Sequence, residues 1–184
     1  MSKVIGGMTM SLDGFINDKG GDVSCLYPDM AELRHTEMME ESIRTTGAVI
    51  MGRRAYDMAQ GDFTGYEYQV PIFVLTHHAP QKVAKGENGA FTFHFVSEGI
   101  EAAVSRAKAA AGERNVTVIG GAQTIRACIK AGLLDEIEVG IMPVLLGAGL
   151  RLFEALGIEP LDLEKIKVVE TGPRTDIVFR VKRH

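Results

Sequence analysis

Short apolar, strand-like runs alternate along this chain with segments of helical periodicity. The runs are rich in β-branched and aliphatic residues and cover 3–10, 47–51, 71–75, 116–119 and 134–142. Apolar residues recur with helical spacing in the segments between them, partly over 30–45, clearly over 98–111, and from Gly121 to near Gly132. Such an alternation builds strand–helix–strand units, in which the strands lie parallel and the helices cover the faces of the sheet. We therefore predict an α/β fold with a mixed, mostly parallel central sheet.

The C-terminal part of the chain has a different pattern. Two strand-like stretches, 163–170 and 175–182, are separated by Thr171-Gly172-Pro173-Arg174, a composition typical of a tight turn. We expect a hairpin that adds antiparallel strands at an edge of the sheet. The clearest helix, earlier in the chain, is expected to have Ser97 as its N-cap and to end at Gly112.

Length and composition fit a single globular domain spanning residues 1–184. Hydrophobic residues make up 46% of the chain and charged residues 24%, values typical of a folded rather than a disordered protein. The formal net charge of -4 argues against nucleic acid as a partner, because phosphate binding requires a basic face. No apolar run reaches the roughly 20 residues of a membrane span, and residues 1–10 lack the pattern of a signal peptide. We therefore expect a cytoplasmic protein with no membrane partner.

The sequence offers little for a metal centre. Its two cysteines, Cys25 and Cys128, form neither a disulfide framework nor a zinc-binding pattern, and we expect both to be small buried side chains. His77 and His78 are adjacent, but on an extended chain their side chains point to opposite sides. No further ligand lies at a suitable spacing, so we expect no bound metal.

Residue types that bind phosphate follow three of the predicted strands, where ligands of α/β sheets bind. Gly120-Gly121 separates a strand from a helix, so the backbone can turn sharply and the helix N-terminus can hold a pyrophosphate. Gln123 and Thr124 can add hydrogen bonds there. Gly52-Arg53-Arg54 follows a second strand with two guanidinium groups, and Thr76-His77 follows a third. Each segment alone also fits an ordinary strand-to-helix turn, but together they predict a dinucleotide lying across the sheet edge.

Five motifs in the chain point to one family. They are Ser11-Leu12-Asp13-Gly14-Phe15-Ile16, Met51-Gly52-Arg53-Arg54-Ala55-Tyr56, Val74-Leu75-Thr76, Val118-Ile119-Gly120-Gly121-Ala122, and Leu133-Leu134-Asp135-Glu136 followed by Pro143-Val144-Leu145-Leu146-Gly147-Ala148-Gly149. In this order and spacing the chain resembles the dihydrofolate-reductase-like superfamily. It is most similar to the C-terminal reductase domain of the bifunctional riboflavin-biosynthesis deaminase–reductase. The resemblance covers nearly the whole chain and implies a reductase that uses NADPH.

The resemblance also implies which residues bind this cofactor, and they lie at the same strand ends. Those at the pyrophosphate are Gly120, Gly121, Ala122 and Thr124. Those at the phosphate groups, including the one on the adenosine ribose, are Gly52, Arg53, Arg54, Thr76 and His77. Those at the nicotinamide are Ile16 and Asn17.

A proton donor for the reduction is harder to assign from the sequence. The protein must supply orientation, a dry site and a proton, because the hydride comes from the cofactor. The candidates are Asp13, Asp29 and Glu32. Asp13 also fits a turn with Gly14, and the other two also fit charges that stabilise a helix start. Water is a further source of the proton.

The substrate stays open because the chain departs from the riboflavin-pathway pattern at two positions. Gly7 stands where those reductases usually carry Lys, and Ile119 stands where they usually carry Glu. The alternatives are reduction of a pyrimidine-like, pterin-like or carbonyl substrate, a dihydrofolate reductase variant, a flavin-binding reductase, and an NADPH-binding module without catalysis. The resemblance further implies a homodimer, to which the apolar segment Leu145–Leu150 contributes.

Overall fold

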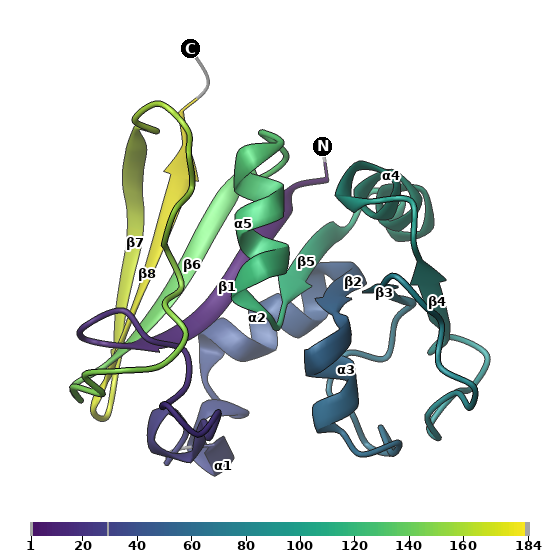
Figure 1. Ribbon diagram of the computed structural model, residues 1–184, viewed down its shortest axis with the longest axis horizontal. Coiled ribbons are helices and arrows are strands. Elements are labelled where there is room, and N and C mark those ends of the chain that lie inside the picture. Colours follow the sequence, from purple (N-terminus) through teal and green to yellow (C-terminus); the bar gives the residue numbers. More distant parts are fainter. Residues whose placement is uncertain (1, 29, 183–184) are drawn as a thin grey trace.

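The computed structural model describes residues 2–28 and 30–182. Within these residues, eight strands form one sheet with the order β4-β3-β2-β5-β1-β6-β8-β7 (Figure 1). The strands are β1 (Val4–Ser11), β2 (Thr46–Gly52), β3 (Ile72–Leu75), β4 (Phe93–Val96), β5 (Asn115–Ile119), β6 (Glu136–Met142), β7 (Leu163–Thr171) and β8 (Arg174–Val181). Each pair of neighbours from β4 along the sheet to β6 (β4, β3, β2, β5, β1, β6) is parallel. Strand β8 is antiparallel to both β6 and β7. The predicted α/β class, the mostly parallel sheet and the C-terminal hairpin are confirmed.

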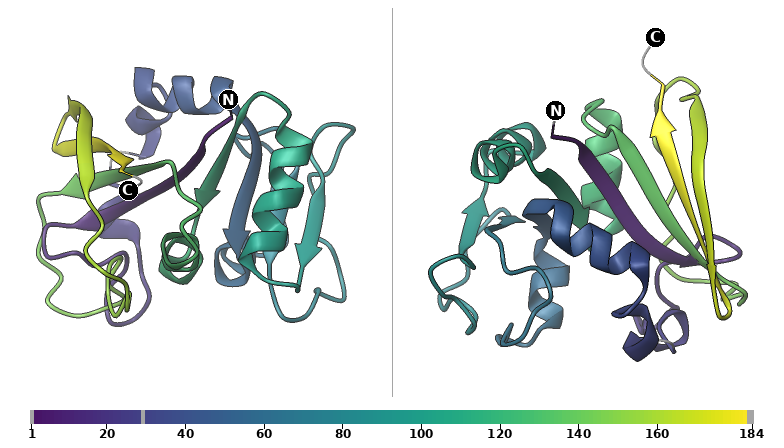
Figure 2. Two further views of the ribbon diagram at one scale, coloured as in Figure 1. Left: turned by 90° about the horizontal axis from the view of Figure 1, so that it is seen from above. Right: turned by 180° about the vertical axis from the view of Figure 1, so that it is seen from behind.

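Helices cover both faces of this sheet (Figure 2). They are the 3-10 helix η1 (Ser24–Leu26), α1 (Met30–Leu33), α2 (Glu37–Thr45), α3 (Arg53–Met58), α4 (Ile100–Ala111) and α5 (Ala122–Lys130). Helices α4 and α5 lie on one face and α2 lies on the other. Because neighbouring residues of a strand point to opposite faces, each central strand must supply apolar side chains to both.

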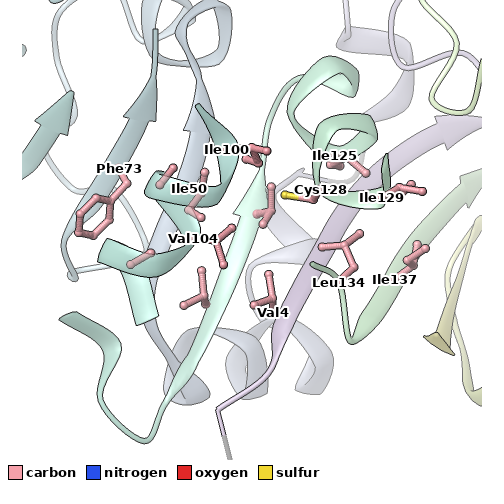
Figure 3. Packing of buried hydrophobic residues seen from close by; sticks show 14 of the residues in the cluster. Val4, Ile50, Phe73, Ile100, Val104, Ile125, Cys128, Ile129, Leu134 and Ile137 are labelled. Carbon is pink, nitrogen blue, oxygen red and sulfur yellow. The ribbon is translucent and has the colours of Figure 1, made fainter. Parts of the chain in front are cut away.

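The face below α4 and α5 holds the larger core (Figure 3). Ile50 and Phe73 from the sheet pack with α4, while Ile125 and Cys128 of α5 pack nearer to β1 and β6. Burial of each such aliphatic side chain stabilises the fold by about 1.5–3 kcal/mol. On the α2 face, the alternate strand residues join aromatic rings, among which Tyr56 lies edge-on to Phe93.

Four local expectations need correction. The segment 30–45, whose apolar residues have partial helical spacing, forms two helices instead of one. The chain turns after α1, and the Thr36 side chain caps α2 by accepting a hydrogen bond from the Met39 N–H. Ser97 is not the N-cap of α4; its hydroxyl donates to Glu98, and Gly99 occupies the cap with a φ of 105°. Cys25 is exposed, whereas Cys128 is buried as expected. Strand β4, a short edge strand, was not predicted at all.

Candidate cofactor and substrate site

The loops that follow β2 and β5 are in direct backbone contact. The Gly52 N–H donates a hydrogen bond to the Gly120 carbonyl at 3.1 Å. A Cβ atom added to Gly120 would lie 2.5 Å from the Ala55 Cβ, and one added to Gly52 would lie 2.7 Å from the Thr124 hydroxyl. Gly120 also has a φ of 77°, which L side chains rarely adopt. Glycine is therefore required at both positions, and the two loops approach as closely as backbones allow.

The loop after β3 joins this pair through an arginine. Arg53 Nη1 donates to the His78 carbonyl at 2.9 Å, while its Nε donates to Asp57 at 2.8 Å. The Thr76 hydroxyl donates to the same His78 carbonyl at 2.9 Å. The structure thus brings together the three strand-end loops that the sequence singled out. Arg54 and His77 are exposed beside them.

Helix α5 begins directly at the glycine pair. Gly121 is its N-cap, and no side chain caps this terminus. Gln123 is exposed, whereas the side chains of Ala122 and Thr124 are buried, Thr124 against the two glycine loops. A helix N-terminus without a side-chain cap attracts anions through its N–H groups and its positive dipole end. This end of the sheet can therefore hold a phosphate or pyrophosphate.

Asp13 is bound to a loop from far along the chain. Its carboxylate accepts hydrogen bonds from the Ser11 hydroxyl at 2.6 Å and from the N–H groups of Leu146 at 3.1 Å and Gly147 at 2.8 Å. The Ser11 hydrogen bond and these two N–H groups lower the pKa of Asp13 to about 2. The carboxyl group is ionised at neutral pH, where it accepts hydrogen bonds and has no proton to donate.

The neighbouring residues make further contacts with the same distant loop. Asn17 Oδ1 accepts from the Leu150 N–H at 2.9 Å, and the Ile16 N–H donates to the Leu150 carbonyl at 2.8 Å. Gly149 lies so close that an added Cβ would be 1.9 Å from the Asn17 carbonyl oxygen. Ile16 is buried in the larger core. The predicted nicotinamide-side loop is therefore fixed by residues 144–151.

The other two acid candidates lie elsewhere. Glu32 is exposed on α1. Asp29 lies outside the described residues. Glu32 is therefore not a buried, shielded acid.

Two polar side chains on the α2 face were missed by the sequence analysis. Arg174 is 1% exposed and donates to the Thr9 hydroxyl at 2.6 Å and to the Leu26 carbonyl at 3.1 Å. Glu138 is half-buried on β6, and burial, with repulsion from Asp176 and Glu136, raises its pKa to about 7. A signal for Glu138 existed, because two carboxylates at alternate positions of a central strand indicate one polar sheet face.

The strand order and the glycine-lined strand ends define a dihydrofolate-reductase-like α/β protein. Dihydrofolate reductase from Enterococcus faecalis, solved with NADP(H), shares this fold with a TM-score of 0.62 at 17% identity, covering 98% of this chain and 97% of that one. Residues 2–177 match the RibD C-terminal domain, and the chain belongs to this family.

Two relatives are similar over most of their length. A protein of known structure from Shewanella sp. PV-4, provisionally assigned to riboflavin biosynthesis, has a TM-score of 0.80 at 25% identity, covering 98% of this chain and 99% of that one. The uncharacterized protein YwjB of Bacillus subtilis is 27% identical over 149 residues, 81% of each chain. The protein therefore has the oxidoreductase-like fold of the RibD C-terminal domain family.

Within residues 2–28 and 30–182, no helix is both long and apolar enough to cross a membrane. In the same residues, no three His, Cys, Asp or Glu side chains gather in a way that could hold a metal ion.

Proposed function

We propose that the protein is an NADPH-dependent reductase that transfers hydride to a small pyrimidine-like, pterin-like or carbonyl substrate. The observation that carries this proposal is the convergence of three strand-end loops, through the Gly52–Gly120 and Arg53–His78 hydrogen bonds. Membership in the RibD C-terminal domain family and the shared fold of an NADP(H)-bound dihydrofolate reductase support it.

The residues present fit this cofactor. The missing side chains of Gly52 and Gly120 let the two loops pack against Ala55 and Thr124, which brings their backbones together beside the N-terminus of α5. In the proposal, the N-terminus of α5, with Gly121, Ala122, Gln123 and Thr124, binds the pyrophosphate. Bound NADPH supplies the hydride. Ile16 and Asn17 border the ring and limit access of water.

The phosphate on the adenosine ribose would lie between α3 and the loop after β3. Arg54 and His77 are exposed there, and Thr76 is half-buried. Arg53 already contacts Asp57 and His78, so it positions the loop and offers only part of its guanidinium group to a ligand. We therefore assign to Arg54 the main preference for NADPH over NADH.

Arg54→Gln is expected to weaken NADPH binding by about 10- to 100-fold and to leave NADH binding unchanged, because one charge-assisted hydrogen bond contributes about 1.5–3 kcal/mol. Nicotinamide fluorescence titration of the wild type and the variant with both cofactors measures this. Arg106→Gln, an exposed arginine of α4 paired with Glu98, is the matched control. Equal binding of NADH and NADPH by the wild type would contradict the roles of Arg53, Arg54 and Thr76, and binding of neither would contradict the function.

The alternative of a cofactor-binding module without catalysis has a distinct outcome. It rests on Gly7 and Ile119, which lie side by side on β1 and β5 and carry no polar group. This alternative predicts tight NADPH binding with no substrate-dependent oxidation. Steady NADPH oxidation that requires an added pyrimidine, pterin or carbonyl compound excludes it.

The homodimer is proposed as part of the same function. Leu145 is 69% exposed, and Leu163 and Val168 are 41% and 47% exposed on the edge strand β7. Exposed apolar side chains along an edge strand favour association. Light scattering is expected to give twice the mass of one chain, and Val168→Glu is expected to halve it, with Val83→Glu as a control at a loop position. A monomeric wild type contradicts the dimer.

A further inference from the structure

Three neighbouring strands place Ile119, Gly7 and Glu138 side by side. The register pairs Gly7 of β1 with Ile119 of β5 on one side and with Glu138 of β6 on the other. All three face α2: Ile119 packs against the aromatic core of that face, and a Cβ at Gly7 would lie 3.8 Å from Glu138 Oε2. Ile119 directly precedes Gly120-Gly121, so this row lies next to the proposed cofactor site.

Gly7 has no side chain and leaves a gap in this row. Apart from its chain neighbours, only Glu138 atoms lie within 4 Å of a Cβ built on this glycine. Neighbouring strands are about 4.8 Å apart, so the backbones of Ile119 and Glu138 lie about 10 Å apart on either side of the gap. A small planar substrate placed here would have the cofactor loops on the Ile119 side and a carboxyl group on the other.

Glu138 faces this space without a fixed partner. Within residues 2–28 and 30–182 its carboxyl group makes no hydrogen bond or ion pair. Because no buried side-chain oxygen there lacks a partner, the carboxyl oxygens of Glu138 must touch solvent. Its position beside the gap at Gly7, with no fixed partner, therefore leaves it available to a ligand.

The charges around Glu138 favour its protonated form. Asp176 of β8, Glu136 of β6 and Glu41 of α2 repel a negative charge at this position, and only Lys167 of β7 opposes them. Tyr68, whose hydroxyl is hydrogen-bonded to Ser42 of α2, is near enough for the charge of Glu138 to help raise the Tyr68 pKa. Burial, together with these neighbours, raises the pKa of Glu138 to about 7, so this carboxyl group is protonated far more readily than an ordinary glutamate.

We propose that Glu138 is the proton donor for the reduction at this site. This inference rests on the proposed function and adds a catalytic residue to it. The two other described candidates are less suited, since Asp13 is ionised and bound to Leu146 and Gly147, and Glu32 is exposed.

The step balances with the cofactor named above. Bound NADPH would supply the hydride that forms a C–H bond at the carbon of a substrate C=N or C=O group, whose π electrons would move to the nitrogen or oxygen. The O–H bond of Glu138 breaks as a new N–H or O–H bond forms, so the cofactor is oxidised and the substrate is reduced by two electrons. The Glu138 carboxylate then takes a proton from solvent.

The first test follows Glu138 without any substrate. A carboxyl group whose pKa is raised on folding makes its full contribution to stability at pH values below its pKa in the unfolded chain. This contribution is lost as the pH rises from that pKa to the pKa in the folded protein. Thermal unfolding of wild type and Glu138→Gln, each with NADPH, is therefore compared between pH 4.5 and 8. The difference in melting temperature, wild type minus Glu138→Gln, is expected to fall by about 5 °C between pH 4.5 and pH 7. Above pH 7 this difference is expected to stay constant. Glu164→Gln, an exposed glutamate of β7, is expected to show no such trend.

The second test measures turnover with two probes, dihydrofolate and 5-amino-6-(5-phosphoribosylamino)uracil. For whichever probe the wild type reduces, Glu138→Gln is expected to lower kcat at least about 100-fold. NADPH binding should be unchanged, and the break near pH 7 in the rate profile should be lost. Where the wild type reduces neither probe, the proposed role of Glu138 is judged by the unfolding comparison.

The outcomes separate the two proposals. A wild type that does not bind NADPH overturns the function and the role of Glu138 with it. NADPH binding with a pH-independent difference in melting temperature, or with wild-type kcat in Glu138→Gln, overturns only the role of Glu138.

Discussion

Gly120→Val is expected to weaken NADPH binding at least about 100-fold. The residue has a φ of 77°, where a β-branched side chain is strained, and a Cβ would lie 2.5 Å from the Ala55 Cβ. The loops after β2 and β5 must then move apart, and the hydrogen bond from Gly52 to the Gly120 carbonyl is lost. Because the proposed pyrophosphate site includes these two backbones, it loses its shape.

Fluorescence titration with NADPH measures this effect, and thermal unfolding checks that the variant is folded. Gly89→Ala is the matched control, because no atom lies within 4 Å of its added Cβ and its φ needs no glycine. A folded Gly120→Val protein that binds NADPH with wild-type affinity would show that the cofactor does not lie across these loops.

Arg174→Met is expected to lower the free energy of unfolding by about 3–5 kcal/mol, since breaking a buried charge network leaves its partners unpaired. Arg174 is 1% exposed, and its loss removes donors from the Thr9 hydroxyl and the Leu26 carbonyl. Its guanidinium group also lies over the Tyr27 ring at 5.6 Å. Strand β8, β1 and the segment around η1 are all held by this one side chain, so the substrate side of the sheet should loosen as well.

Urea denaturation and thermal unfolding of the variant measure the loss, which corresponds to about 10 °C in melting temperature. Arg180→Met is the control on the same strand, because Arg180 is exposed and pairs only with Glu164 at the surface. Such surface pairs contribute about 0–1 kcal/mol. Equal stabilities of the two variants would contradict the structural role given to Arg174.

The loops of the candidate site could be predicted because their signals are local. Glycine pairs after apolar runs mark strand ends, and Gly52, Thr76 and Gly120 all lie where the sequence placed them. Residues 163–170 and 175–182 were likewise recognised by the turn between them, and β7 and β8 follow closely. Short-range patterns of this kind depend on only a few neighbouring residues.

Contacts between distant strands could not be predicted in this way. The row of Ile119, Gly7 and Glu138 exists because β1 lies between β5 and β6, and strand order is not written in local periodicity. Asp13 was considered as an acid from its place after β1, but its partners at 146 and 147 lie more than a hundred residues away. Strand β4 was missed for a related reason, since four residues at a sheet edge carry too little pattern.

The contacts of Asp13 and Asn17 with residues 146–150 also bear on how the site forms during synthesis. A nascent chain that ends before residue 144 holds the three strand-end loops but leaves the polar groups of Asp13 and Asn17 without these partners. If the proposed function holds, the nicotinamide end of the site would therefore form after the phosphate end. A partly translated or proteolytically shortened chain would then keep the proposed phosphate-binding loops without the contacts that fix the loop at the reactive ring.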